Sequence, residues 1–124
     1  MTSKRPKHLN LFVIRLPLPG IVSILHRVSG AGLFFLIPVL LWILDRSLAS
    51  AEGYNQIHEA FTAPLAKLFV LGVVWAVLHH LFTGLRFLAL DLHFGGELEA
   101  TRLISKLIVA ASVGLTFLVG VWIW

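Results

Sequence analysis

Three long apolar runs, separated by two shorter polar segments, dominate the sequence. The first extends from Val28 to Leu44, the second from about residue 64 to 90, and the third from about residue 103 to 124. About 20 apolar residues in a helix cross the roughly 30 Å of hydrocarbon in a bilayer. The pattern therefore predicts an all-α membrane protein with three transmembrane helices, at about 21–45, 64–90 and 103–124.

The segments between these runs complete a single membrane-anchor domain. Residues 1–20 are basic and include Pro17 and Pro19. Because prolines deny a helix its amides, we expect an extended arm here and a helix start near Ile21–Ser23. Pro38 lies inside the first span, where membrane helices tolerate proline. Residues 46–62 and 91–101 are predicted to be polar loops.

The composition supports a membrane protein and narrows its chemistry. Hydrophobic residues make up 58% of the chain and charged residues 13%, against about 25% charged in soluble domains. The sequence has no patch of lysine and arginine interleaved with aromatic residues, so nothing in it indicates nucleic-acid binding. The chain has no cysteine, which excludes thiolate zinc, iron–sulfur ligation and covalent haem attachment within it. A metal here would need histidine or carboxylate ligands.

The distribution of basic residues predicts the orientation in the membrane. Ten lysines and arginines are present, and only Arg46 and Lys67 belong to the side that carries the first loop. The other side has Lys4, Arg5, Lys7, Arg15, Arg27, Arg86, Arg102 and Lys106. Since positive residues favour the cytoplasm, the N-terminus is predicted to be cytoplasmic and the C-terminus to lie on the outer side of the membrane.

The second span carries ionisable residues, which are costly in hydrocarbon and mark functional sites. Helical residues spaced by three, four or seven share a face. One stripe contains His80, Gly84, Phe87 and Asp91, and the neighbouring stripe contains His79, Thr83 and Arg86.

A neutral imidazole with a glycine one turn away suits axial ligation of haem b. Arg86, nearer the surface, could meet a propionate. Alternatively, the histidine only hydrogen-bonds across a helix interface. From spacing alone, either His79 or His80 could be the haem ligand, although Gly84 favours His80.

A second polar cluster lies at the start of the first span and contains Ser23, His26 and Arg27, followed by Ser29 and Gly30. A hydroxyl, an imidazole and a guanidinium can hydrogen-bond a quinone carbonyl or haem carboxylates. An ordinary basic helix end anchored in lipid headgroups is the alternative. Because Arg86 and Asp91 are predicted to reach the same cytoplasmic edge, a site shared by both clusters is favoured.

Two motifs in these clusters resemble a known family. Ser23-Ile24-Leu25-His26-Arg27-Val28-Ser29-Gly30 and His80-x-x-x-Gly84-Leu85-Arg86-Phe87-Leu88-x-x-Asp91, together with Arg5-Pro6, are similar to signatures of the cytochrome b membrane-anchor subunit of succinate dehydrogenase (complex II). The resemblance covers essentially the whole chain and implies a multi-pass protein of the bacterial inner membrane with a periplasmic C-terminus. Lys7, Phe87 and Leu90 depart from the commonest residues of the family.

The resemblance implies a haem b shared with a second membrane-anchor subunit, with His80 as one axial ligand of the iron. It implies that Ser23 and Arg27 line a ubiquinone pocket, and that His26 and Arg27 lie near the haem propionates. Gly84 and Arg86 would belong to the haem pocket. Iron–sulfur and flavoprotein subunits would dock on the cytoplasmic face, so this chain could not oxidise succinate alone.

Three alternatives to a succinate:ubiquinone anchor remain. The first is an anchor of a fumarate reductase, which would oxidise a quinol. The second is a structural anchor without haem. A small transporter or channel is the third, and it is disfavoured because the polar groups gather at one edge of the membrane.

Overall fold

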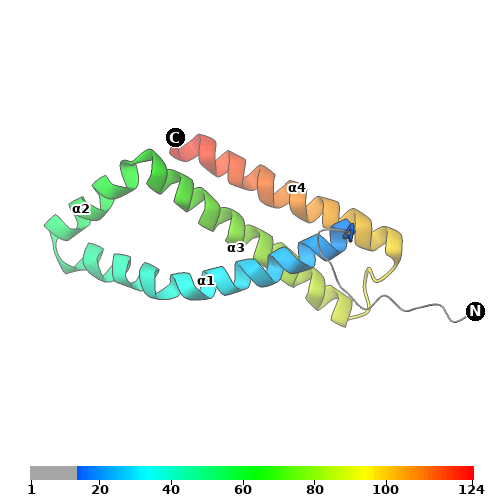
Figure 1. The fold of residues 1–124 in the computed structure, drawn as a ribbon. Coiled ribbons are helices and arrows are strands. Elements are labelled where there is room, and N and C mark those ends of the chain that lie inside the picture. The colour runs from blue at the N-terminus through cyan, green and yellow to red at the C-terminus, as the bar shows by residue number, and fades with distance from the viewer. Residues whose placement is uncertain (1–13) are drawn as a thin grey trace, which may run out of the picture.

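Four helices make up almost all of the part of the chain that the structure describes. The computed structural model describes residues 14–124, so most of the predicted basic arm, including Lys4, Arg5 and Lys7, lies outside it. The helices are α1 (Leu18–Ala49), α2 (Ala51–Thr62), α3 (Pro64–Asp91) and α4 (Leu98–Ile123) (Figure 1). No strand occurs in residues 14–124, and α1, α3 and α4 are each long and apolar enough to cross a membrane. The predicted all-α fold with three spans is confirmed.

The first helix begins earlier than the prolines predicted. Pro17 is the N-cap of α1 and Pro19 lies in its first turn. The amides of a first helical turn have no partner within the helix, so proline removes nothing there and its fixed φ suits the helix. The expected start near Ile21–Ser23 is therefore wrong, and the extended segment ends at Pro17.

The segment predicted as a polar loop, residues 46–62, is instead helical almost throughout. α1 continues to Ala49, and α2 follows after a single residue, Ser50. The Ser50 hydroxyl accepts a hydrogen bond from the Gly53 amide at 2.9 Å, which satisfies one of the free N–H groups at the helix start. The prediction failed because it took polarity as a sign of a loop, whereas α2 is a polar helix that lies mostly exposed.

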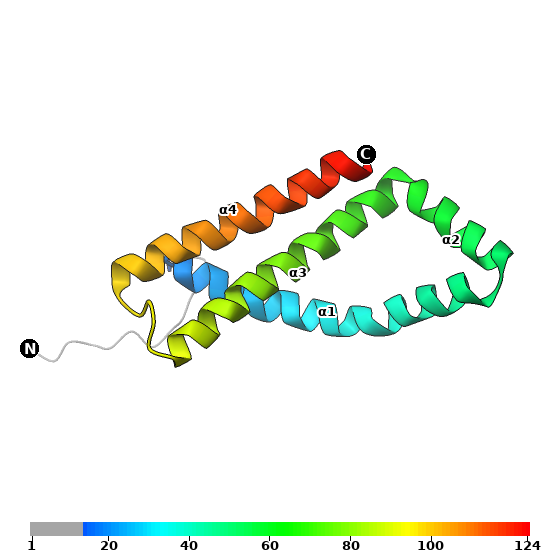
Figure 2. The same ribbon diagram turned by 180° about the vertical axis from the view of Figure 1, so that it is seen from behind.

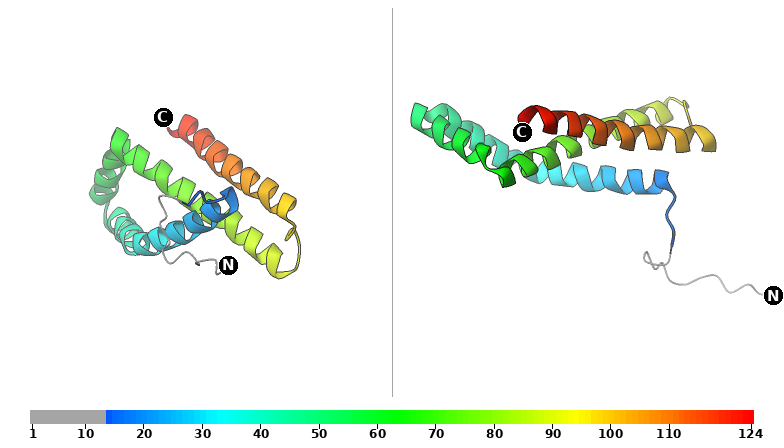
Figure 3. Two further views of the ribbon diagram at one scale, coloured as in Figure 1. Left: turned by 45° about the vertical axis from the view of Figure 1, so that its right-hand side comes forward. Right: turned by 90° about the horizontal axis from the view of Figure 1, so that it is seen from above.

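The three long helices form a bundle with α3 in contact with both α1 and α4 (Figures 1 and 2). The start of α1 and the connection between α3 and α4 lie at one end of the bundle, and α2 and the C-terminus lie at the other. The start of α1 also lies near the first half of α4 (Figure 3), and these two helices are in contact. The α3–α4 connection is short because α4 begins at Leu98, five residues earlier than predicted.

The bundle is built with small or polar side chains inside and large apolar ones outside. The buried residues of the described chain are Val22, Ser29, His79, Thr83, Arg86, Ser105, Ile108 and Ser112. By contrast, Phe35, Leu65 and Trp122 are 72%, 80% and 86% exposed. Lipid tails are as apolar as leucine, so membrane helices associate through close approach of small residues and polar contacts. The packing is therefore that of a membrane bundle.

Candidate cofactor site

Two histidines meet where α1 crosses α3. The rings of His26 and His80 are stacked, with centroids 4.2 Å apart and planes only 6° from parallel. Phe87, two turns beyond His80 on α3, places its ring edge-on against His26 at 5.2 Å. The structure thus joins the two polar clusters that the sequence placed on separate spans.

Hydrogen bonds orient the His80 ring. Its Nδ1 lies 3.1 Å from the His26 carbonyl oxygen and 3.4 Å from the Ser29 hydroxyl. The Ser29 hydroxyl itself donates to the His26 carbonyl at 3.0 Å. Because a carbonyl oxygen can only accept, the neutral imidazole carries its proton on Nδ1, and Nε2 keeps a free lone pair. Histidines that bind metals commonly donate their second nitrogen to a carbonyl in this way.

Two glycines allow the close approach of the histidines. A Cβ on Gly30 would lie 2.8 Å from Cε1 of His80, a distance at which one of the two must move. Gly84 faces the other histidine, and a Cβ there would make an ordinary contact of 3.6 Å with Nε2 of His26. Gly30 is therefore the residue that fixes how near His80 lies to α1, a role that the sequence analysis missed although it named Ser29 and Gly30 as neighbours.

His79 points into the bundle and is completely buried. Its Nε2 donates to the carbonyl oxygen of Val22 at 3.4 Å, and its ring stacks on Trp75 at 5.2 Å. A side chain enclosed by its own bundle cannot reach a group shared with another subunit. His80 is only partly buried, so of the two adjacent histidines it is the one open to a cofactor.

Arg86 lies on the buried stripe with His79 and Thr83 and is 9% exposed. Its Nε has no hydrogen-bond partner in the part of the chain that the structure describes. Its guanidinium carbon lies 5.8 Å from the ring centroid of Phe87. A buried guanidinium is costly unless an anion pairs with it, so Arg86 fits a carboxylate group brought by a ligand.

The remaining predicted site residues lie nearer the surface. On α1, Ser23 is partly buried and Arg27 is exposed, while Asp91 is exposed at the end of α3. No group of three or more histidine, cysteine or acidic residues that could hold a metal occurs within residues 14–124.

The whole chain is similar to proteins of one kind. A family described as "Succinate dehydrogenase/Fumarate reductase transmembrane subunit" matches residues 1–119. The chain is 38% identical to the succinate dehydrogenase cytochrome b556 subunit of Coxiella burnetii, over the full length of both proteins. It is 33% identical to the subunit of that name from Paracoccus denitrificans, over 92% of this chain and 88% of the relative.

The chain belongs to this family of transmembrane subunits. The resemblance predicted from the two motifs is confirmed, as is the location in the bacterial inner membrane as a multi-pass protein. A transmembrane subunit of succinate dehydrogenase or fumarate reductase is one part of a larger complex. The roles of Ser23, His26, Arg27, His80, Gly84 and Arg86 and the orientation of the termini remain predictions.

Proposed function

We propose that this chain is the haem b-binding membrane anchor of a succinate:ubiquinone oxidoreductase and that it helps to form the quinone-reduction site. The observation that carries the proposal is the His80 ring, which is partly exposed, held by its Nδ1–H, and left with a lone pair on Nε2. The relatives are named cytochrome b556 subunits of succinate dehydrogenase. Their names favour the succinate direction over fumarate reduction.

Haem b supplies a one-electron redox centre when it is bound. His80 would hold the iron through Nε2, and a second membrane-anchor subunit would supply another ligand. The His26 carbonyl holds the His80 ring from behind, and the absence of a side chain at Gly30 lets that ring lie against α1. Arg86 would pair its buried guanidinium with a propionate, with Gly84 in the pocket wall and His26 and Arg27 close by.

The quinone would lie at the end of the bundle where α1 begins. Ser23 and Arg27 are one helical turn apart there, and both can donate hydrogen bonds to quinone carbonyl oxygens. Donors fixed in advance stabilise negative charge that develops on those oxygens during reduction. The iron–sulfur and flavoprotein subunits would dock on this face and oxidise succinate, so the chain is not catalytic alone.

The haem ligand is tested by spectroscopy of the assembled complex. We expect His80→Ala to abolish the b-type absorption band of the reduced complex, since the iron loses an axial ligand. His79→Gln is the matched neighbour, and because His79 is enclosed by the bundle that variant should keep the band. The assignment is overturned if His79→Gln loses the band and His80→Ala retains it. An absent band in the unmodified complex would leave a purely structural anchor.

The quinone site is tested by measuring quinone reduction, and the b-type band shows whether the variant complex still assembles with haem. Ser23→Ala should lower quinone reduction by about 10-fold or more, as expected when a donor that stabilises developing charge is removed, while the b-type band persists. Ser47→Ala serves as the control, because Ser47 lies at the far end of α1, where its hydroxyl donates a hydrogen bond to the Leu44 carbonyl. Undiminished quinone turnover in Ser23→Ala would contradict the proposed role.

A further inference from the structure

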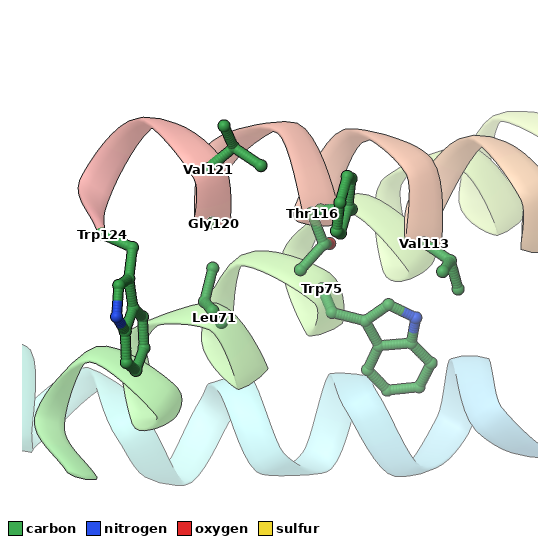
Figure 4. Close-up of a pocket in the computed structure, with 8 residues that line it drawn as sticks. Leu71, Trp75, Val113, Thr116, Gly120, Val121 and Trp124 are labelled. Carbon is green, nitrogen blue, oxygen red and sulfur yellow. The ribbon is translucent and has the colours of Figure 1, made fainter. Parts of the chain in front are cut away.

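A groove lies between α3 and α4 in the half of the bundle near α2 and the C-terminus (Figure 4). Its volume is about 460 Å³. The lining is apolar apart from one threonine and is contributed by both helices: Leu71, Trp75, Val113, Thr116, Phe117, Gly120, Val121 and Trp124. Leu71 rises from α3 toward Gly120, where a Cβ would touch it at 3.5 Å. This contact brings the two helices together.

One cation stands at the end of this groove. Nζ of Lys67, in the first turn of α3, lies 5.4 Å from the ring centroid of Trp124. The first turn of α3 contains no acidic residue, and no side chain in residues 115–124 is acidic. Lysine and tryptophan together at the end of a span mark the depth of the lipid headgroups.

We propose that this groove binds one anionic phospholipid. An acyl chain would lie along the apolar lining between α3 and α4, and the phosphate would pair with the ammonium of Lys67. Lysine binds phosphate as a point charge, and the acyl chain would gain contact with the apolar lining of the groove. The proposal does not depend on haem or quinone binding, because the groove lies toward the opposite end of the bundle from the His26–His80 contact.

The charge at Lys67 favours a phospholipid over a helix of a neighbouring subunit. A transmembrane helix lying in the groove would cover the ammonium, and a covered cation without a partner is costly at that depth. A phospholipid brings its own anion at the level of the headgroups and an apolar chain below it. One ligand therefore satisfies both parts of the site.

The test measures binding of phosphatidylglycerol to the delipidated complex by native mass spectrometry. We expect Lys67→Gln to weaken binding by up to about five-fold, the factor that corresponds to the ~1 kcal/mol upper end for an ion pair near the surface. Lys106→Gln is the matched control, because it removes an exposed lysine from the other end of the bundle and should bind as the unmodified complex does. Equal binding by Lys67→Gln and Lys106→Gln overturns the headgroup contact.

A second measurement asks what covers the groove. The chain has no cysteine, so Val121→Cys provides a unique thiol in it, at a residue that is 66% exposed. In the assembled complex this thiol should react with a maleimide carried on a lipid acyl chain and should form no crosslink to another subunit. A crosslink to a neighbouring subunit, with the lipid reagent excluded, would show a protein occupant and overturn the proposal.

Discussion

Gly30 and His80 approach each other as closely as their atoms allow. The His80 ring lies where a side chain on Gly30 would stand, and the same ring is held by the His26 carbonyl one turn earlier on α1. The position of the proposed iron ligand is therefore set by a residue on another helix that carries no side chain.

Replacing Gly30 with alanine should displace His80. The added methyl would meet Cε1 at 2.8 Å, and overpacking of this kind costs about 1–3 kcal/mol. We expect the Gly30→Ala complex to contain less haem, measured by the b-type band per mole of complex. Gly114→Ala is the control, since nothing lies within 4 Å of a Cβ there. A full haem content in Gly30→Ala would show that haem binding does not depend on the position of the His80 ring.

At the scale of elements, the sequence did not predict the tight corner between α1 and α2. A single residue, Ser50, separates the two helices, and α2 contacts both α1 and α3. Gly53 lies so close to the carbonyl oxygen of Arg46 that a Cβ could not be accommodated without movement. This contact keeps α2 folded back against the end of α1.

Substitution of Gly53 should open this corner. Although alanine favours a helix by about 0.5–1 kcal/mol over glycine, Gly53→Ala would press its methyl against a backbone carbonyl that cannot rotate away. We therefore expect a lower thermal unfolding temperature of the purified complex in Gly53→Ala than in Gly114→Ala, where the helical gain comes without a contact. A higher unfolding temperature for Gly53→Ala would contradict the tight corner.

The sequence predicted the spans well because each is a long apolar run, and length and hydropathy are local properties. It did not predict α2, whose residues are polar and whose helix depends on the Ser50 cap and the Gly53–Arg46 contact. It found His80, His26 and Ser29 as candidates by motif, yet the His26–His80 stack and the Gly30 contact depend on how α1 crosses α3. Crossing geometry is set by packing between helices, which periodicity along one chain does not contain.

For the whole molecule, the arrangement of the ends yields a prediction about topology. The start of α1 and the α3–α4 connection lie together, opposite α2 and the C-terminus. Of the basic residues in the described part of the chain, all except Arg46 and Lys67 belong to the first end. A periplasm-dependent alkaline phosphatase should therefore be active when fused after Trp124 and inactive when fused after Gly96. The reverse pattern of activity would place the start of α1 outside the cytoplasm and would contradict docking of the catalytic subunits at that end.

The packing with small residues inside also changes how the chain should tolerate substitution. In a soluble domain, replacing a leucine or phenylalanine with alanine removes core contacts and is damaging. Here Phe35 and Leu65 face outward, whereas Ser105 and Ser112 are fully enclosed between helices. A saturation scan should find that enlarging the serines abolishes assembly, while exchanges among large apolar residues at lipid-facing positions pass unnoticed. Among the residues outside the proposed haem and quinone sites, the small side chains would then be the most sensitive to substitution.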